Sequence, residues 1–332
     1  MKTFFALLFL LGVPQAEAAT KSEKTPFSWI EDMAYASRET NFDVTYTYLK
    51  GISMHTVRAI HMKVNGEERE RRFNLSGANR ELYREGKAVS CVHSEVQSKE
   101  NITLERCVAS GPFSSAFPER IMKAQNLYNF SLLPKSRIID RTAIQISISP
   151  KFDDRYGYIV WIDEKSGLLL KSVLTDRGRA REVFQIVRLK LGDQVDESDL
   201  ESRIQKDGYV RRLYSEPRSK KSKPIVTVNW LPSGFKSVRR QGNRLHFTDG
   251  LANVSVFVNS RNSDLLPDLA TSSGGTVLLT MKLKEREQQI TVVGNVPMKT
   301  ARRVAESVEP VVYWGRIFSF QKAVLCRYAK KW

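Results

Sequence analysis

The sequence is short of cysteine, histidine and long apolar runs, and each shortage excludes a class of protein. Its three cysteines form no C-x-x-C pair, which argues against a dithiol redox centre and a cysteine-based zinc site. Of its four histidines, His55 and His61 share one predicted strand, but two ligands without a third do not make a zinc site. The one continuous apolar run, Phe4–Val13, is too short to cross a bilayer, so a multi-span membrane protein is excluded.

The motifs of common catalytic sites are also missing. The sequence holds no G-x-S-x-G, no H-E-x-x-H, no glycine-rich phosphate loop and no dinucleotide fingerprint. His246 and Asp249 are close in sequence, but they fall at a predicted strand end and turn, where we expect a structural polar pair. We therefore predict a binding protein and no enzyme, with no cofactor and no metal. An exported hydrolase of another type is one alternative.

The amino terminus has the three parts of a secretory signal peptide. Lys2 supplies the positive start, Phe4–Val13 the apolar middle, and Ala16-Glu17-Ala18 the small-residue cleavage site. We predict that residues 1–18 are removed before Ala19. The mature chain is then expected in the periplasm of a Gram-negative source.

Export places the cysteines in an oxidising compartment. Cys91 and Cys107 flank a predicted hairpin centred near Lys99, and we predict that they form a disulfide. Closing a loop of this size stabilises a chain by about 3 kcal/mol in the chain-entropy model. Cys326 is left over near the carboxyl terminus.

The chain is short of acidic residues, and its formal net charge is +17. The excess is concentrated in two segments, residues 211–224 and residues 315–332. Because export argues against a nucleic-acid partner, we expect anionic lipid head groups, lipopolysaccharide or an acidic protein segment. A nucleic-acid binder would show a steep salt dependence of DNA binding. In the alternative interpretation, these charges belong to a solvated linker and tail that only aid solubility.

Apolar periodicity predicts an α+β fold that is mainly antiparallel β. Ser28 and Glu31 form a capping-box pattern at the start of a first helix. From Phe42 to Tyr48 the period changes to two, and about ten such strands follow as far as Leu191. So many half-apolar strands are expected to curl into an open half-barrel, with helices at its mouth. The concave face of such a sheet predicts an apolar cavity that suits an acyl chain.

Periodicity stops at residues 211–224, which hold two prolines and three serines, and then a second unit begins. One small sheet with a helix over Lys299–Val308 predicts an α+β domain. The predicted organisation is a signal peptide (1–18), a large domain (19–210), a basic linker (211–224), a small domain (225–314) and a basic tail (315–332).

Three segments of the second unit resemble motifs of the sigma-E regulatory protein family RseB/MucB. They are W-L-P-S-G-F at Trp230–Phe235, F-T-D-G-L-A-N-V-S-V-F at Phe247–Phe257, and V-V-G-N-V-P at Val292–Pro297. The resemblance extends from about Phe27 to Trp314 and includes the W-I-D sequence that ends at Asp163. The tail, the Cys91/Cys107 pair and the strongly basic linker depart from the family pattern.

This resemblance implies a periplasmic negative regulator that binds a single-span anti-sigma factor of the RseA/MucA type, shields it from proteolysis and releases it on a lipid or lipopolysaccharide signal. It also implies a large domain similar to the carriers LolA and LolB; a plain lipid or lipoprotein carrier is the main alternative. A homo-oligomer stays open. The lipid-binding candidates are Phe42, Tyr46, Tyr48, Ile60, Met62, Phe73, Tyr158 and Leu170. The partner-binding candidates are Trp230, Phe235, Arg239, Arg240 and Phe257.

Overall fold

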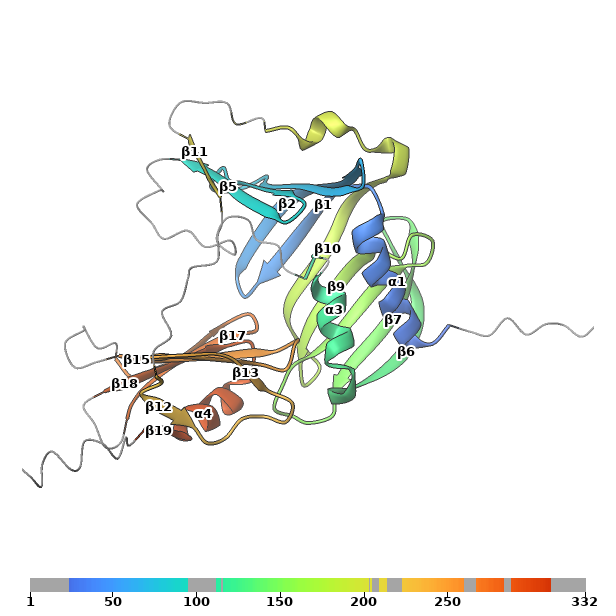
Figure 1. The fold of residues 1–332 in the computed structure, drawn as a ribbon. Helices are drawn as coiled ribbons and strands as arrows, with labels where there is room; N and C mark the ends of the chain where they lie inside the picture. Colours follow the sequence, from blue (N-terminus) through green and yellow to red (C-terminus); the bar gives the residue numbers. More distant parts are fainter. Residues whose placement is uncertain are drawn as a thin grey trace, which may run out of the picture.

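The computed structural model describes residues 24–94, 112–114, 116–202, 204, 209–213, 223–259, 267–283 and 288–311. These residues form a large domain around an eleven-stranded sheet and a small domain around a six-stranded sheet (Figure 1). The predicted signal peptide, Cys107, Cys326 and the basic tail lie outside the described residues.

In the large domain every neighbouring pair of strands is antiparallel, in the order β11-β5-β4-β3-β2-β1-β10-β9-β8-β7-β6. Because β11 and β6 are its two edges, the sheet is open, and the predicted curved half-barrel with a smaller second domain is confirmed. Its elements in chain order are α1 (Pro26–Glu39), β1 (Phe42–Lys50), β2 (Ser53–Val64), β3 (Glu67–Asn74), β4 (Glu81–Glu85), β5 (Ala88–Ser94), α3 (Ala116–Lys123), η2 (Gln125–Leu127), β6 (Tyr128–Ile138), β7 (Arg141–Pro150), β8 (Gly157–Asp163), β9 (Leu169–Asp176), β10 (Arg179–Leu191), η3 (Gly192–Gln194), η4 (Glu197–Leu200) and β11 (Tyr209–Leu213).

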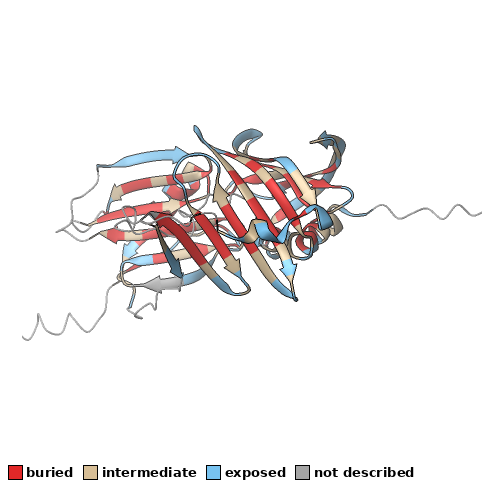
Figure 2. Ribbon diagram, turned by 90° about the horizontal axis from the view of Figure 1, so that it is seen from above, coloured by how far each residue is buried: buried red, intermediate tan, exposed pale blue. Residues whose placement is uncertain are grey.

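Alternation along the strands gives the sheet one apolar face. Val44 and Tyr46 of β1 are fully buried, and they pair with Ala59 and Val57 of β2. Helices α1 and α3 contact each other and cover this face over the later strands; they contribute Ile30, Met33, Phe117 and Ile121 to the same core. Figure 2 shows the buried residues as bands across the strands.

The small domain has a sheet with the order β13-β14-β15-β18-β17-β16. Helix α4 contacts β17 and β18, and a core of Val254, Val256, Val292 and Val304 lies between helix and sheet. The elements are β12 (Val226–Val228), β13 (Lys236–Gln241), β14 (Arg244–Thr248), β15 (Asn253–Asn259), β16 (Leu269–Ser273), β17 (Thr276–Lys282), β18 (Gln289–Gly294), α4 (Met298–Glu306) and β19 (Val308–Pro310), with β12 paired to β19.

The two domains pack directly against each other. A β-carbon on Gly275, in the turn between β16 and β17, would lie 2.2 Å from Leu174 Cδ2 of β9. A β-carbon on Gly234 would lie 2.7 Å from Leu127 Cδ1. Glycine therefore permits both close approaches. Strand β11 extends to Leu213, so the first residues of the predicted linker are strand in the structure.

Candidate functional site: the cavity between the domains

A cavity of about 1070 Å³ lies between the concave face of the large sheet, the start of α3 and the small domain. It is as large as pockets that hold drug-sized ligands, so an amphiphile or a peptide segment fits by volume. The large domain lines it with Tyr48, Lys50, His55, Arg72, Asn74, Ser76, Gly77, Ala78, Arg80, Leu82, Arg84, Val89, Tyr158, Ser172, Leu174, Glu182 and Phe184. The segment at α3 adds Pro112, Ser114, Ala116, Phe117 and Arg120, and the small domain adds Leu251, Asn253, Thr276, Val293, Gly294 and Asn295.

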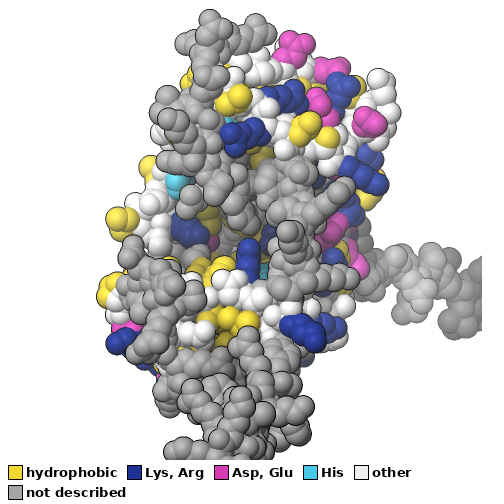
Figure 3. All heavy atoms as spheres, turned by 60° about the vertical axis from the view of Figure 1, so that its left-hand side comes forward, with side chains coloured by type: hydrophobic (Ala, Val, Ile, Leu, Met, Phe, Trp, Pro, Cys, Tyr) yellow, Lys and Arg dark blue, Asp and Glu magenta, His cyan; other side chains and the backbone are white. Residues whose placement is uncertain are grey.

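The lining combines positive charge with apolar surface. It contains Lys50 and four arginines (Arg72, Arg80, Arg84 and Arg120), whereas Glu182 is its one carboxylate among the described residues. Figure 3 turns this side of the molecule forward and shows Lys and Arg side chains beside hydrophobic ones. A concave site with an excess of one sign of charge attracts ligands of the other sign. The cavity is therefore suited to an anionic ligand that also has an apolar part.

Glu182 joins the two domains at the wall of the cavity. Tyr48 donates a hydrogen bond to its carboxylate, and the backbone N–H of Gly275 donates a second one over 2.9 Å. Burial, followed by the charge of Glu182, raises the pKa of Tyr48 above its ordinary value, so the hydroxyl stays a donor. The same carboxylate therefore contacts the lining of the cavity and the backbone of the small domain.

A second junction between the domains is a fully buried ion pair. Arg155, in the loop before β8, places Nη1 2.6 Å from Asp249 Oδ2, and neither side chain is exposed. Its Nη2 donates to the carbonyl of Ser233 over 2.7 Å, and its Nε donates to Asp154 over 2.8 Å. Asp249 also accepts from the backbone N–H groups of Leu251 and Ala252. Asp249 thus holds the D-G-L-A turn and binds the large domain, while the expected partner His246 lies 2.8 Å from Ser255 Oγ instead.

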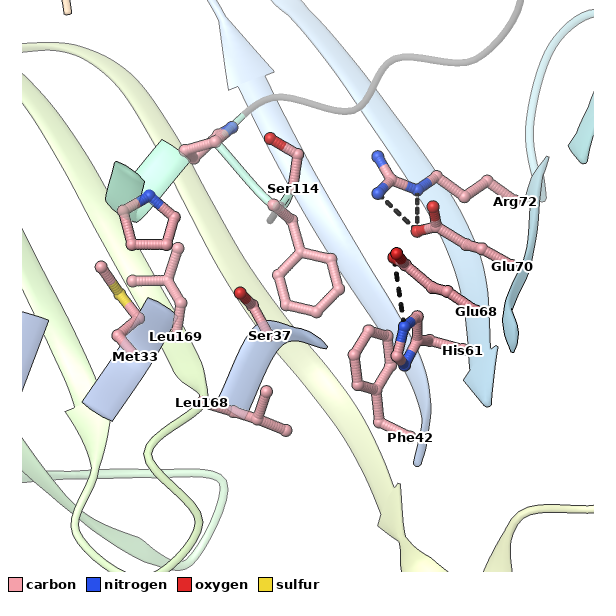
Figure 4. Close-up of a pocket in the computed structure, with 13 residues that line it drawn as sticks. Met33, Ser37, Phe42, His61, Glu68, Glu70, Arg72, Ser114, Leu168 and Leu169 are labelled. Atoms are coloured by element: carbon pink, nitrogen blue, oxygen red, sulfur yellow. Dashed lines mark hydrogen bonds and ion pairs between the residues drawn. The ribbon is translucent and has the colours of Figure 1, made fainter. Parts of the chain in front are cut away.

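A second, small cavity lies beneath α1 (Figure 4). Its volume of about 20 Å³ suits one water molecule and no larger ligand. The buried His61 stacks on Phe42, with its Nδ1 3.0 Å from the carbonyl of Thr40 and its Nε2 3.3 Å from Glu68. These contacts tie the strands to the end of α1, which makes His61 a structural residue.

Five of the eight predicted lipid-binding residues share the concave face: Phe42, Tyr46, Tyr48, Tyr158 and Leu170. Only Tyr48 and Tyr158 line the large cavity. Tyr46 and Leu170 are fully buried within the core, and Phe42 lines the small cavity. Whether any of them contacts lipid stays a prediction.

The placement of Ile60, Met62 and Phe73 on that face is wrong. In β2 the concave positions are Val57, Ala59 and His61, so the intervening Ile60 and Met62 face the other side. Phe73 pairs with Arg58 on this convex side and packs against the guanidinium of Arg71, 4.4 Å from its ring. The apolar pattern of β2 indicated the wrong face, because its concave positions include the small Ala59 and the polar His61.

Of the predicted partner-binding residues, Trp230, Phe235 and Phe257 lie outside the cavity lining. Trp230 and Phe235 pack on the small core, where the guanidinium of Arg303 lies 4.0 Å from the Trp230 ring. Phe257 is stacked by Arg244 at 5.2 Å. Arg239 and Arg240 belong to β13, and their side chains lie outside what the structure describes.

Apart from Thr276, the small-domain residues that line the cavity come from two of the motifs noted in the sequence. Asn253 and Asn295 lie side by side: the N–H of Asn253 donates to Asn295 Oδ1 over 2.6 Å, and the N–H of Asn295 donates back to the Asn253 carbonyl. The signal was present in the D-G-L-A-N and V-V-G-N segments. Asn253 and Asn295 were not selected from the sequence, because aromatic residues were expected to anchor the partner.

The described residues contain no helix long and apolar enough to cross a membrane. Within the same residues, no cluster of three or more His, Cys, Asp or Glu side chains is placed to hold a metal ion. Cys91 is disulfide-bonded, but both other cysteines lie outside the described part of the chain, so its pairing with Cys107 stays a prediction.

The fold and the cavity define a two-domain binding protein. Two family models match the chain: the MucB/RseB N-terminal domain over residues 25–204 and the MucB/RseB C-terminal domain over residues 220–309. The chain therefore belongs to the MucB/RseB family.

Relatives support the same assignment along almost the whole chain. The chain is 29% identical to the sigma factor AlgU regulatory protein MucB of Pseudomonas aeruginosa, over 92% of this chain and 97% of the relative. It is 28% identical to the sigma-E factor regulatory protein RseB of Haemophilus influenzae, over 91% and 95%. The structure matches MucB in the Pseudomonas aeruginosa MucA/MucB complex with a TM-score of 0.69 and 26% identity, over 87% of this chain and 99% of that one. These names describe regulatory proteins.

Proposed function

We propose that this protein is a periplasmic negative regulator that binds the periplasmic segment of a single-span anti-sigma factor. The observation that carries the proposal is the match, across both domains, to MucB in its complex with MucA. The cavity between the domains supports it, because a partner segment there would contact Leu251, Asn253 and Val293 together with the large sheet. The aromatic residues Trp230 and Phe257 would then support the small domain without touching the partner.

The bound segment would be shielded from a protease, and an anionic amphiphile would release it. Release requires that the amphiphile and the partner prefer different states of the protein, since a ligand shifts an equilibrium only through a difference in its affinity for the two states. A tenfold loss of partner affinity needs about 1.4 kcal/mol of coupling. Competition for the cationic, half-apolar cavity supplies such a difference directly, and lipopolysaccharide has the required phosphate groups and acyl chains.

Calorimetric titration tests the proposal. The chain from Ala19 onward is titrated with the periplasmic segment of the anti-sigma factor encoded beside it, with and without lipopolysaccharide. We expect binding that weakens at least tenfold when lipopolysaccharide is present. Lipopolysaccharide that leaves the affinity unchanged would refute the coupling, and a partner that does not bind would refute the regulator.

Two variants of cavity-lining residues, each with a matched control, test whether the ligands bind in the cavity. Ala116 lines the cavity at the start of α3 and is exposed, so Ala116→Trp adds bulk there without disturbing a core. Ala180 of β10 is exposed outside the lining, and Ala180→Trp is its control. For charge, Arg120→Glu in the lining is compared with Arg137→Glu, whose side chain is 78% exposed elsewhere. Only Ala116→Trp and Arg120→Glu should weaken the binding of both the anti-sigma segment and lipopolysaccharide.

A lipid or lipoprotein carrier is the second candidate, favoured by the volume and the positive lining of the cavity. A carrier needs no anti-sigma partner. Retention of lipid by a chain that shows no affinity for the anti-sigma segment would select it.

A further inference from the structure

Four large apolar side chains are exposed together at the hairpin between β1 and β2 and at the adjoining end of β3. Ile52, at the turn, is fully exposed, while Met54 is 67%, Leu75 51% and Leu49 39% exposed. We call Leu49, Ile52, Met54 and Leu75 the apolar rim. Single exposed apolar residues are ordinary on a protein surface, but a contiguous group marks an interaction site.

The strand register makes the rim contiguous. Leu49 lies directly opposite Met54 in the β1–β2 pair. Leu75 donates its N–H to the carbonyl of Thr56 over 2.8 Å, which places it on the next strand, diagonal to Met54. The turn itself is braced, because a β-carbon on Gly51 would lie only 3.1 Å from Ser273 Oγ of the small domain. The rim is therefore presented on a supported edge.

The charges around the rim have one sign. Residues 47–57 and 74–80, which carry the rim, contain Lys50 and Arg80 and no acidic residue. Glu182 faces Lys50 from β10, but its carboxylate accepts hydrogen bonds from Tyr48 and Gly275. The whole chain has a formal net charge of +17. An apolar projection flanked by cations is complementary to the surface of an anionic bilayer.

The segments that carry the rim also contribute to the cavity. Lys50, His55, Asn74, Ser76 and Arg80 belong to the same two segments and line the large cavity. Leu49 and Met54 alternate with Lys50 and His55 along the strands, so a surface docked on the rim would contact the convex side of the hairpin whose concave side lines the cavity. We propose that the apolar rim docks this protein onto an anionic lipid bilayer. A projecting turn favours lipid over a protein helix, which would need a groove.

Sedimentation with vesicles tests the inference and does not depend on the anti-sigma factor. The chain from Ala19 onward is mixed with vesicles of phosphatidylethanolamine and phosphatidylglycerol, or of phosphatidylcholine alone. We expect binding to the anionic vesicles. In the double variant I52D/M54D the affinity should fall at least tenfold, because burial of one such side chain contributes about a factor of ten.

The control is L132D/F152D, which makes the same change in charge at two other exposed apolar residues, Leu132 of β6 and Phe152 of the β7–β8 loop. Equal losses in the two double variants would mean that net charge alone drives binding, and would overturn the proposal. A rim variant that still binds vesicles, whether or not it loses the anti-sigma segment, would overturn it as well.

A second measurement follows insertion directly. Ile52→Trp places a fluorophore at the tip, and Leu132→Trp places one at the control site. Because the chain already contains five tryptophans, each variant is compared with the unsubstituted chain. The emission added at residue 52 should shift to the blue and be quenched by bromine-labelled acyl chains, whereas the emission added at residue 132 should not. Quenching of neither, with vesicles bound, would show that another surface contacts the lipid.

Discussion

The buried pair of Arg155 and Asp249 allows a sharp test of how the two domains are joined. Arg155→Met removes a guanidinium that has three hydrogen-bonding partners and no exposed surface. It leaves the Asp249 carboxylate buried beside an apolar side chain. Breaking a buried ion pair at one partner costs about 3–5 kcal/mol, and we expect a loss of about 3 kcal/mol in the free energy of unfolding at neutral pH.

The loss should depend on pH with a defined sign. Burial raises the pKa of Asp249, and in the native protein the backbone N–H of Ala252 and the charge of Arg155 oppose this effect. Without Arg155 the folded-state pKa rises further. A group whose folded-state pKa lies above its unfolded value stabilises the fold at low pH and loses that contribution as the pH rises through the folded-state pKa. The variant should therefore come closest to the wild-type stability in mild acid.

A second substitution should rescue the first. Asp249→Asn keeps an oxygen for the N–H groups of Leu251 and Ala252 but removes the charge. At neutral pH the double variant R155M/D249N should be more stable than R155M alone, since it buries no uncompensated charge. Urea unfolding at two pH values measures all four proteins, and Asp140→Asn in an exposed pair is the surface control. Additive losses in the double variant would refute the coupling of the two residues.

Three further predictions concern stability. Burial alone raises the pKa of Asp163, but hydrogen bonds from Arg141 and Ser166 bring that pKa below its ordinary value. Asp163→Asn should therefore reduce the loss of stability that wild type shows below about pH 4. If urea unfolding shows the same loss of stability in acid for the variant and wild type, this prediction is contradicted. Gly275→Ala should cost about 1–3 kcal/mol, because its β-carbon would overlap Leu174, and wild-type thermal stability would refute that contact. Leu170→Ala should cost about 2–5 kcal/mol and leave the affinity for lipopolysaccharide unchanged; a loss of affinity without a loss of stability would assign Leu170 to the ligand.

Local patterns predicted most of the strands and helices because they depend on neighbours in sequence. The start of α1 shows where such patterns are ambiguous. Ser28 and Glu31 matched a capping box, yet the helix begins at Pro26, and Thr25 is the N-cap that accepts the N–H of Ser28 over 3.1 Å. Proline suits the first helical position because it has no N–H to satisfy. Two capping signals overlapped, and proline favours the earlier one.

The candidate site was less predictable because its residues meet only in the folded chain. Arg155 and Asp249 are 94 residues apart, and the approach of Gly275 to Leu174 depends on how two independent sheets pack. The period-two pattern identified the strands but did not identify which face of β2 is concave. The segments that resembled a family contain Asp249 and Asn295, but neither residue was among the predicted site residues, and composition indicated only that a cationic surface exists.

Glu182 takes part both in the lining of the cavity and in the contact between the domains. Its carboxylate lines the cavity and accepts the N–H of Gly275, while Tyr48 holds it from the other side. A ligand that drew this carboxylate or Tyr48 toward itself would weaken a contact with the small domain that is separate from the Arg155–Asp249 ion pair. Other contacts between the domains, such as the hydrogen bond from Thr300 Oγ1 to the carbonyl of Asp154 over 2.9 Å, would remain if this one were lost. We therefore expect that loss of the Glu182 contact alone would loosen the orientation of the domains without separating them.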